Sequence, residues 1–347
     1  MRTRMLPKKI RPLRFFPSTS MAFRRIDIHH HYFPPDLAKE KINADVGWIT
    51  PQENLPWSPR VSLCAMDEMS IDYAVLSFPA ISSGSVSDEN RAVARARNVF
   101  AANVCSSHPH RFGFFATLPF LDDVEGCLQE IAYAFDHLQA QGVSFASSYG
   151  EGSAAQYLGD NRYDPIWDEL DRRGATAFIH GSQTPSSTPF PNAFLGLPIC
   201  EVPNETFKAA AHLVVTSKKR KFSNIKFILA HMGGTVPYLA PRVAILSRHM
   251  GCPLTPEEII EDFKTFYYET ALSAYESTLA AIDVFVPSDH ILFGTDFPAV
   301  SKGMAEWFTK NIEKYCEGDK DKLEGVMGNN AWKILNNVSE TRTTGMT

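Results

Sequence analysis

The chain has 347 residues, of which 44% are hydrophobic and 21% charged, so it can bury a full core and is not a disordered protein. Its formal net charge of -5 excludes the strongly basic surface of a nucleic-acid-binding protein, and no apolar stretch approaches the roughly 20 residues of a membrane-spanning helix. The only basic cluster, at 218–221, is interpreted as a solvated helix end rather than a nuclear address. The six cysteines include no CxxC pair, which argues against a zinc ribbon or a disulfide scaffold and favours the cytoplasm.

Both ends of the chain are expected to lie outside the folded domain. Residues 1–24 contain many lysines and arginines but no acidic residue, a composition shared by mitochondrial presequences. Three prolines interrupt any amphipathic helix there, so we favour a disordered basic extension and keep mitochondrial import as the alternative. Residues 25–337 are predicted to form one barrel domain and residues 338–347 a flexible tail.

The pattern of apolar residues predicts an α/β fold. Segments rich in β-branched and aromatic residues are predicted strands, at 25–29, 73–78, 112–117, 142–146, 175–180, 225–230, 265–270 and 290–295. Helical periodicity is found at 60–69, 89–108, 123–141, 165–173, 204–219 and 274–286. Strand–helix repetition through eight cycles is typical of a (β/α)8 TIM barrel. The proline-rich segments 32–59, a small loop-rich insertion after the first strand, and 181–203 are expected to overhang the barrel mouth.

Four histidines and one aspartate stand at the ends of predicted strands. They are His29, His31, His180, His231 and Asp296. Because the carboxyl ends of barrel strands share one face, these side chains are expected to meet there. Side chains alternate along a strand, so His29 and His31 are expected to face the barrel axis and His30 to face away.

Three of these imidazoles and the carboxylate form a set that is typical of a catalytic metal site. His29, His31 and His180 supply nitrogen and Asp296 supplies oxygen, which leaves one or two coordination positions open. This set favours one divalent ion, Zn2+, with Mn2+ as the alternative. A fifth protein ligand would leave little room for substrate. We therefore assign His231 as the general acid or base beside the metal, with Asp296 as its possible hydrogen-bond acceptor.

Six motifs carry a family resemblance that extends over residues 25–337. They are IDIHHH at 26–31, MDEMSIDYAVLS at 66–77, RFGFFATLP at 111–119, FIH at 178–180, LAHMGG at 229–234 and LFGTDFP at 292–298. With these motifs the chain resembles the amidohydrolase superfamily, in the branch of aminocarboxymuconate-semialdehyde decarboxylase and fungal 6-methylsalicylate decarboxylase. By this resemblance the family's metal ligands and catalytic histidine match the residues assigned above.

Two positions narrow the resemblance. Related hydroxybenzoate decarboxylases open with Glu-x-His and carry a glutamate after the later His-x-Gly, whereas this chain has His29 and Gly234. These residues place it on the aminocarboxymuconate side. The fourth predicted strand, VSFAS at 143–147, lacks the lysine that bridges two metals in binuclear amidohydrolases, so one metal ion is implied.

The resemblance implies a carboxy-lyase that releases CO2 and a phenol from a hydroxybenzoate such as 6-methylsalicylate. A metal-dependent hydrolase of a lactone or amide is the alternative, because the same ligands serve both reactions. Arg60 is a candidate contact for the substrate carboxylate, with a surface position equally open. The resemblance also implies a homodimer, since family members are commonly dimers.

Overall fold

A parallel barrel forms the centre of the molecule in a computed structural model, which describes residues 25–183 and 191–336. Its strands are hydrogen-bonded in the order β1-β2-β3-β4-β7-β8-β9-β10. Their bounds are β1 (Ile26–His31), β2 (Tyr73–Ser77), β3 (Phe112–Thr117), β4 (Gly142–Ala146), β7 (Thr176–His180), β8 (Lys226–Leu229), β9 (Tyr267–Glu269) and β10 (Ile291–Leu292). Each observed strand overlaps its predicted segment, and the predicted TIM barrel is confirmed. A short hairpin of β5 (Ser148–Tyr149) and β6 (Gln156–Tyr157) was not predicted.

Backbone hydrogen bonds close the barrel between β1 and the segment that follows β10. The Asp296 amide donates to the His29 carbonyl at 2.8 Å, and the His31 amide donates to the Phe297 carbonyl at 2.7 Å. Three of the predicted site residues therefore lie on the two chain segments that meet at this seam.

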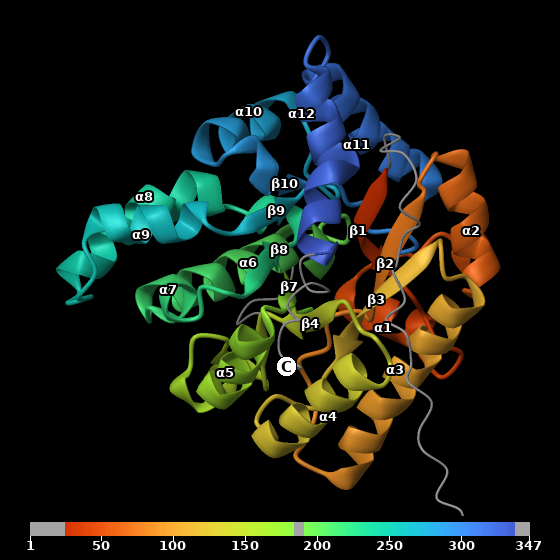
Figure 1. Ribbon diagram of the computed structural model, residues 1–347, viewed down its shortest axis with the longest axis horizontal. Helices are drawn as coiled ribbons and strands as arrows, with labels where there is room; N and C mark the ends of the chain where they lie inside the picture. Colours follow the sequence, from red (N-terminus) through yellow and green to blue (C-terminus); the bar gives the residue numbers. More distant parts are fainter. Residues whose placement is uncertain (1–24, 184–190, 337–347) are drawn as a thin grey trace, which may run out of the picture.

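Helices surround the barrel (Figure 1). They are α1 (Lys39–Val46), α2 (Pro59–Glu68), α3 (Asp88–Ser107), α4 (Val124–Asp136), α5 (Asp164–Arg173), α6 (Leu197–Val215), α7 (Lys218–Lys221), α8 (Val236–His249), α9 (Pro256–Lys264), α10 (Glu276–Phe285), α11 (Lys302–Tyr315) and α12 (Lys320–Glu324). All the predicted helical segments are confirmed, whereas α1, α8, α9, α11 and α12 were missed.

Both segments expected to overhang the mouth contain helix. Segment 32–59, predicted as loop, holds α1 and a single 3-10 turn, Gln52–Asn54. In segment 181–203 the described part includes the first turns of α6, which begins at Leu197. The predicted start of α6, at 204, was too late because a proline inside a helix is unusual and Pro203 marks an expected boundary. Pro198 occupies the first turn of the observed helix, where no amide donor is needed, and Pro203 lies inside it.

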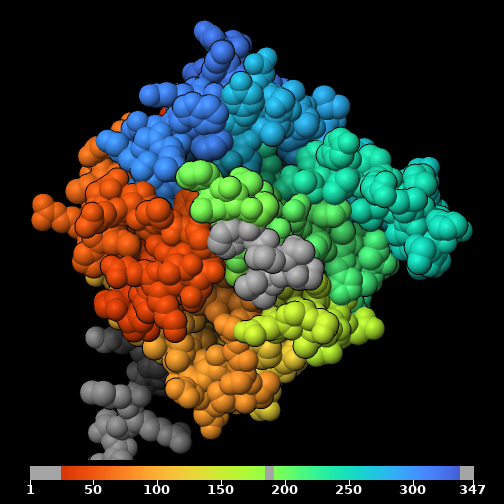
Figure 2. Space-filling model, turned by 180° about the vertical axis from the view of Figure 1, so that it is seen from behind, coloured from red at the N-terminus to blue at the C-terminus, as the bar shows by residue number. Residues whose placement is uncertain are grey.

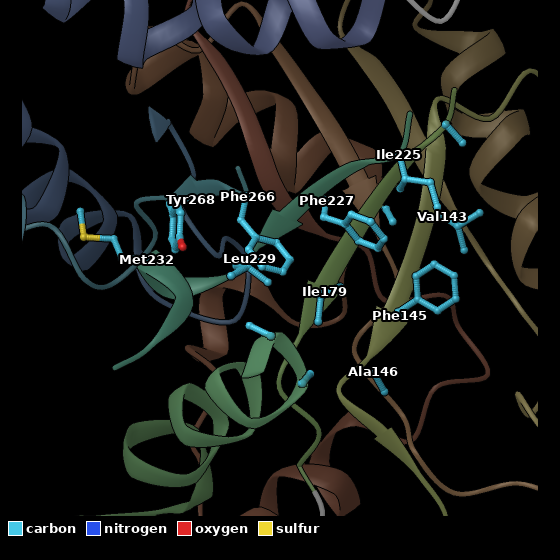
Figure 3. Packing of buried hydrophobic residues seen from close by; sticks show 14 of the residues in the cluster. Val143, Phe145, Ala146, Ile179, Ile225, Phe227, Leu229, Met232, Phe266 and Tyr268 are labelled. Carbon is cyan, nitrogen blue, oxygen red and sulfur yellow. The ribbon is translucent and has the colours of Figure 1, made fainter. Parts of the chain in front are cut away.

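Apolar side chains fill the space on both sides of the barrel wall. Figure 3 shows side chains such as Val143, Ile179 and Phe227, which stand on neighbouring strands in the cluster between barrel and helices. Inside the barrel, Phe115 and Phe178 stack with ring centroids 5.7 Å apart. Phe178 also lies against His29, with ring centroids 5.0 Å apart. The barrel is therefore packed beneath the histidines, as TIM barrels are, and is not a pore.

The sequence predicted that the lysine and arginine cluster on α7 is a solvated helix end, and this prediction is wrong. Lys218 and Lys219 are both buried. The Lys218 ammonium pairs with Asp164 and lies 2.7 Å from the Asn161 amide oxygen, while Lys219 lies over the rings of Phe227 and Phe266. Two of the four basic residues are therefore buried, and Lys221 is the exposed member of the cluster.

Three sequence predictions concern the chain ends or membranes. The expected basic extension and the expected tail both lie outside the described residues. Within residues 25–183 and 191–336, no helix has both the length and the apolar character needed to cross a membrane.

Candidate active site

The structure brings all five predicted residues together at the carboxyl end of the barrel. His29 and His31 lie on β1, His180 ends β7, and His231 and Asp296 follow β8 and β10. Ligand atoms of His29, His31 and Asp296 lie within 4.8 Å of one another, and so do those of His29, His180 and His231. His29 belongs to both groups and therefore stands at the centre of the site.

A separate acceptor fixes the orientation of each imidazole through its Nδ1 atom. His29 Nδ1 lies 2.8 Å from Glu269 Oε1, and the Nδ1 atoms of the other three rings lie 2.8 to 3.2 Å from backbone carbonyl oxygens. These carbonyls belong to Ser77, Gly181 and Ala271. When Nδ1–H donates outward, the Nε2 lone pair is left to bind a cation or carry a proton. This geometry suits metal ligation and acid–base chemistry equally well.

His30 faces away from this centre, as strand alternation predicted. Its Nδ1 lies 2.9 Å from Asp27 Oδ2, and its Nε2 lies 2.8 Å from Ser62 Oγ. Asp27 also accepts hydrogen bonds from the amide and hydroxyl of Thr295. The outward network therefore ties β1 to the residue before Asp296.

His29, His31 and Asp296 present an arrangement that a divalent cation fits. His29 Nε2 and His31 Nε2 lie 3.1 Å apart, although both rings direct Nδ1 to other acceptors. Asp296 Oδ1 lies 3.1 Å from His31 Nε2, is buried, and has no hydrogen-bond donor among the described residues. Lone pairs that face one another in a buried site repel unless a cation lies between them.

Burial and neighbouring charges keep the donor set in the protonation state that a metal requires. Burial lowers the pKa of His29 and of His180 well below the usual value, so both rings are neutral near pH 7. Burial alone would raise the pKa of Asp296, but His29 and His31 outweigh this effect and hold it below its usual range. Neutral imidazoles and an ionised carboxylate are the forms that bind Zn2+ or Mn2+.

Two site residues adopt left-handed backbone conformations, which side chains other than glycine rarely do. His231 has φ of 54° and Asp296 has φ of 62°. Such strain costs about 1–3 kcal/mol per residue and is concentrated at functional sites. No hydrogen bond joins His231 to Asp296 in the described part of the chain, so the suggested contact between them is not observed.

The glycines after His231 serve packing. A Cβ atom at Gly234 would lie 2.0 Å from the Pro203 carbonyl oxygen, and one at Gly233 would lie 2.8 Å from the Tyr268 ring. The two glycines let the turn after β8 pack closely against α6 and β9.

A pocket of about 250 Å³ opens above the site. Its wall includes His31, His180, His231 and Asp296, together with side chains from three distant segments. These segments contribute Trp48 from the insertion, Pro198 and Val202 from α6, and Met304 and Phe308 from α11. Figure 2 shows the red, green and blue parts of the chain meeting on one face of the molecule. Both predicted overhanging segments therefore contribute to the pocket.

The two tryptophans of the insertion have different roles. Trp48 lines the pocket and donates to the Ala299 carbonyl at 3.0 Å. Trp57 is buried away from the pocket and donates to Ser62 Oγ at 3.0 Å. One is a pocket wall and the other anchors the loop.

Comparison with known proteins identifies the family. The amidohydrolase family profile matches residues 26–336. The chain belongs to the amidohydrolase family. The 6-methylsalicylic acid decarboxylase of Penicillium expansum is 37% identical over 300 residues, which cover 84% of this chain and 90% of the relative. The 6-methylsalicylic acid decarboxylase of Aspergillus aculeatus is 36% identical over 302 residues, or 84% of this chain and 89% of the relative.

Solved structures share the fold of this amidohydrolase. A 2,6-dihydroxybenzoate decarboxylase complexed with 2,6-dihydroxybenzoate is 21% identical, with a TM-score of 0.76 over 91% of this chain and 100% of its own. A dihydroxybenzoic acid decarboxylase from Polaromonas, with bound manganese and the inhibitor 2-nitroresorcinol, is 24% identical. Its TM-score is 0.74 over 91% of this chain and 97% of its own.

Sequence reasoning missed one residue that holds the amidohydrolase site together. Glu269, at the end of β9, accepts from His29 Nδ1 at 2.8 Å, from the His231 amide at 2.5 Å and from the Ala271 amide at 2.7 Å. Burial raises its pKa to about 7, while the charge on His231 and the two amide donors act against this rise. The available signal was its position as the one carboxylate in the seventh predicted strand.

The cation in this amidohydrolase pocket is also not the one that the sequence suggested. Arg60 is exposed on α2 and does not line the pocket, so the proposed contact with a carboxylate is not supported. Lys39, the first residue of α1, does line it and is buried. Burial lowers the pKa of Lys39 to about 8, with Asp296 opposing the shift, so the ammonium is still protonated at pH 7.

Proposed function

We propose that this amidohydrolase is a metal-dependent carboxy-lyase that removes CO2 from a hydroxybenzoate such as 6-methylsalicylate and releases 3-methylphenol. The observation that carries the proposal is a buried histidine, His231, beside three imidazoles and a carboxylate in a pocket sized for one aromatic ring. The two fungal 6-methylsalicylic acid decarboxylases, with 36% and 37% identity, support the choice of substrate.

We assign His29, His31, His180 and Asp296 as the residues that hold one divalent ion, with Zn2+ favoured over Mn2+. Three nitrogen donors and one carboxylate favour zinc among common ions, and a manganese-containing relative makes Mn2+ the alternative. When bound, the ion supplies positive charge that orients the substrate oxygens and stabilises negative charge on them.

In this proposal His231 acts as the general acid. Its Nδ1 donates to the Ala271 carbonyl, so Nε2 can carry the proton that is delivered. Nε2 gives this proton to the ring carbon that bears the carboxylate. The carbon–carboxylate bond then breaks, its electron pair returns to the ring, and CO2 leaves. His231 regains a proton from solvent, which balances the reaction.

Incorporation of deuterium into the phenol product tests decarboxylation against the hydrolytic alternative. Incubation of 6-methylsalicylate with the metal-loaded protein in D2O is expected to release CO2 and to place one deuterium at the vacated ring position. Mass spectrometry and proton NMR of the 3-methylphenol product measure this incorporation. Turnover of lactones or amides without CO2 release would refute the decarboxylase and establish the hydrolase, in which His231 is a base toward water.

We also propose a homodimer that forms through α8. Large hydrophobic residues are exposed here: Tyr238, Ile245 and Leu246 on the helix and Met250 at its C-terminal cap, with exposed fractions of 84%, 59%, 43% and 82%. A stripe of this kind on a helix at the edge of the molecule is typical of an interface (Figure 1). Light scattering is expected to give twice the chain mass, and Ile245→Glu is expected to give a monomer. A monomeric parent protein would refute the dimer.

We further propose the cytoplasm as the location. All six cysteines are free thiols, which supports a reducing compartment.

A further inference from the structure

Lys39 reaches the pocket because of the way α1 is oriented. Lys39, Asn43 and Val46 are the buried residues of this helix and follow helical spacing, while Glu40 and Lys41 are exposed. The Asn43 amide exchanges hydrogen bonds with Thr50 Oγ1, at 3.0 and 3.2 Å. This contact fixes the inner face of α1, so Lys39 extends into the pocket from a supported helix.

The Lys39 ammonium has no anionic partner in residues 25–183 and 191–336. Nζ lies over the Phe33 ring, whose centroid is 4.9 Å away. Asp296, the other charged residue of the pocket wall, is not within ion-pair distance of Lys39 and faces His29 and His31. A cation removed from water without an acceptor is costly, so the pocket is built to receive an anion at this point.

The rest of the wall fixes the class of this anion. Apart from Lys39, Asp296 and the three histidines, the wall is mainly apolar, as at Val202, Met304 and Phe308. An aromatic ring with an alkyl substituent matches this surface, and a single carboxylate matches the single fixed positive charge. A second carboxylate would meet no second positively charged side chain in the wall.

We propose that Lys39 is the substrate-binding residue that holds the carboxylate of an aromatic monocarboxylate in this pocket. This inference rests on the proposed decarboxylase for the position of the reacting ring. The carboxylate that Lys39 binds is charged before the reaction, and this negative charge is lost from the carboxyl group when CO2 leaves. Its contact therefore contributes to substrate binding more than to the transition state.

The decisive test separates the charge of the ligand from its shape. Calorimetry compares 6-methylsalicylate with the neutral 2-hydroxy-6-methylbenzamide, using metal-loaded His231→Asn protein so that the acid is not consumed. Adding Lys39→Met to this protein is expected to weaken binding of the acid about 10- to 100-fold, as for a lost charge-assisted hydrogen bond, and to leave amide binding unchanged. Lys39→Arg is expected to restore much of the affinity.

Lys41→Met is the matched control, because this lysine lies two residues along the same helix and is exposed. In the parent enzyme, Lys39→Met is expected to raise KM with little change in kcat. If Lys39→Met weakened binding of the acid and of the amide equally, or weakened neither, the assignment would be overturned. It would also be overturned if the parent protein bound the amide as tightly as the acid. This comparison of acid and amide binding by the parent protein needs no Lys39 variant, so it tests the assignment even if Lys39→Met does not fold.

Two further measurements complete the design. Salicylate is expected to bind at least about tenfold more tightly than 5-carboxysalicylate, because the second carboxylate is buried without a partner, and equal affinity would overturn the preference for one carboxylate. Absence of CO2 release by the parent protein would refute the proposed function alone. In that event Lys39-dependent binding of the acid would still support the role of Lys39, and its absence would refute that role.

Discussion

His231→Asn is expected to lower turnover of 6-methylsalicylate by roughly 10²–10⁴-fold and to leave one metal ion per chain. The asparagine amide can donate to the Ala271 carbonyl as His231 Nδ1 does, at 3.0 Å in the parent chain, so the local fold is retained. Only the Nε2 position is lost, and with it the proton that reaches the ring carbon. Rates from CO2 release and metal content from plasma mass spectrometry measure the two effects separately.

The control for this variant is His249→Asn, because His249 is exposed at the end of α8 and is remote from the pocket wall. It is expected to keep both activity and metal. His231 lies within 4.8 Å of ligand atoms from His29 and His180, so a metal-ligand role has a definite signature. Loss of metal from His231→Asn would make His231 a ligand and would contradict its assignment as the general acid.

His180→Ala is expected to lose metal and turnover together. His180 ends β7, and its ring is buried and kept neutral, with Nδ1 held by the Gly181 carbonyl at 2.8 Å. Removing the ring takes away one of three nitrogen donors, and a site with two histidines and one carboxylate binds divalent ions much more weakly. Metal titration followed by dialysis is expected to show substoichiometric binding.

Exposed His110 provides the control for this variant, since His110→Ala removes an imidazole without touching the site. Added Zn2+ or Mn2+ in excess is expected to recover part of the His180→Ala activity, because the catalytic acid remains. Stoichiometric metal retained through dialysis would show that His180 is not a ligand. Circular dichroism of both variants separates loss of metal from loss of fold.

Local sequence patterns were sufficient to predict the strands because the barrel wall is buried on both sides. Runs such as Ala177-Phe-Ile at the end of β7 are apolar at every position, and their length and β-branched content distinguish them from helices. The helices were predicted less well. α8 has apolar residues on its exposed side, such as Tyr238 and Ile245, as well as on its buried side, and Pro241 lies inside it, so its sequence lacks the single apolar face of a surface helix.

The two candidate anion contacts show why a charged residue is difficult to assign from sequence. Arg60 and Lys39 both follow the first strand, and a charged residue is by default expected to lie in water. The orientation of the helix that carries each residue decides its exposure: Arg60 lies on the outer side of α2, whereas Lys39 on α1 is buried and lines the pocket. The direction in which a short helix faces depends on packing and on contacts such as that of Asn43 with Thr50.

The sequence by itself determined that five side chains meet at the barrel mouth, because each of them stands at the end of a recognisable strand and a barrel brings such ends to one face. The tertiary structure alone decided how each ring is oriented. Glu269 and the carbonyls of Ser77, Gly181 and Ala271 hold the Nδ1 atoms, and three of these four acceptors lie about 40 or more residues from the ring that they hold. Such contacts arise only when distant strands and loops pack together, and no local periodicity records them.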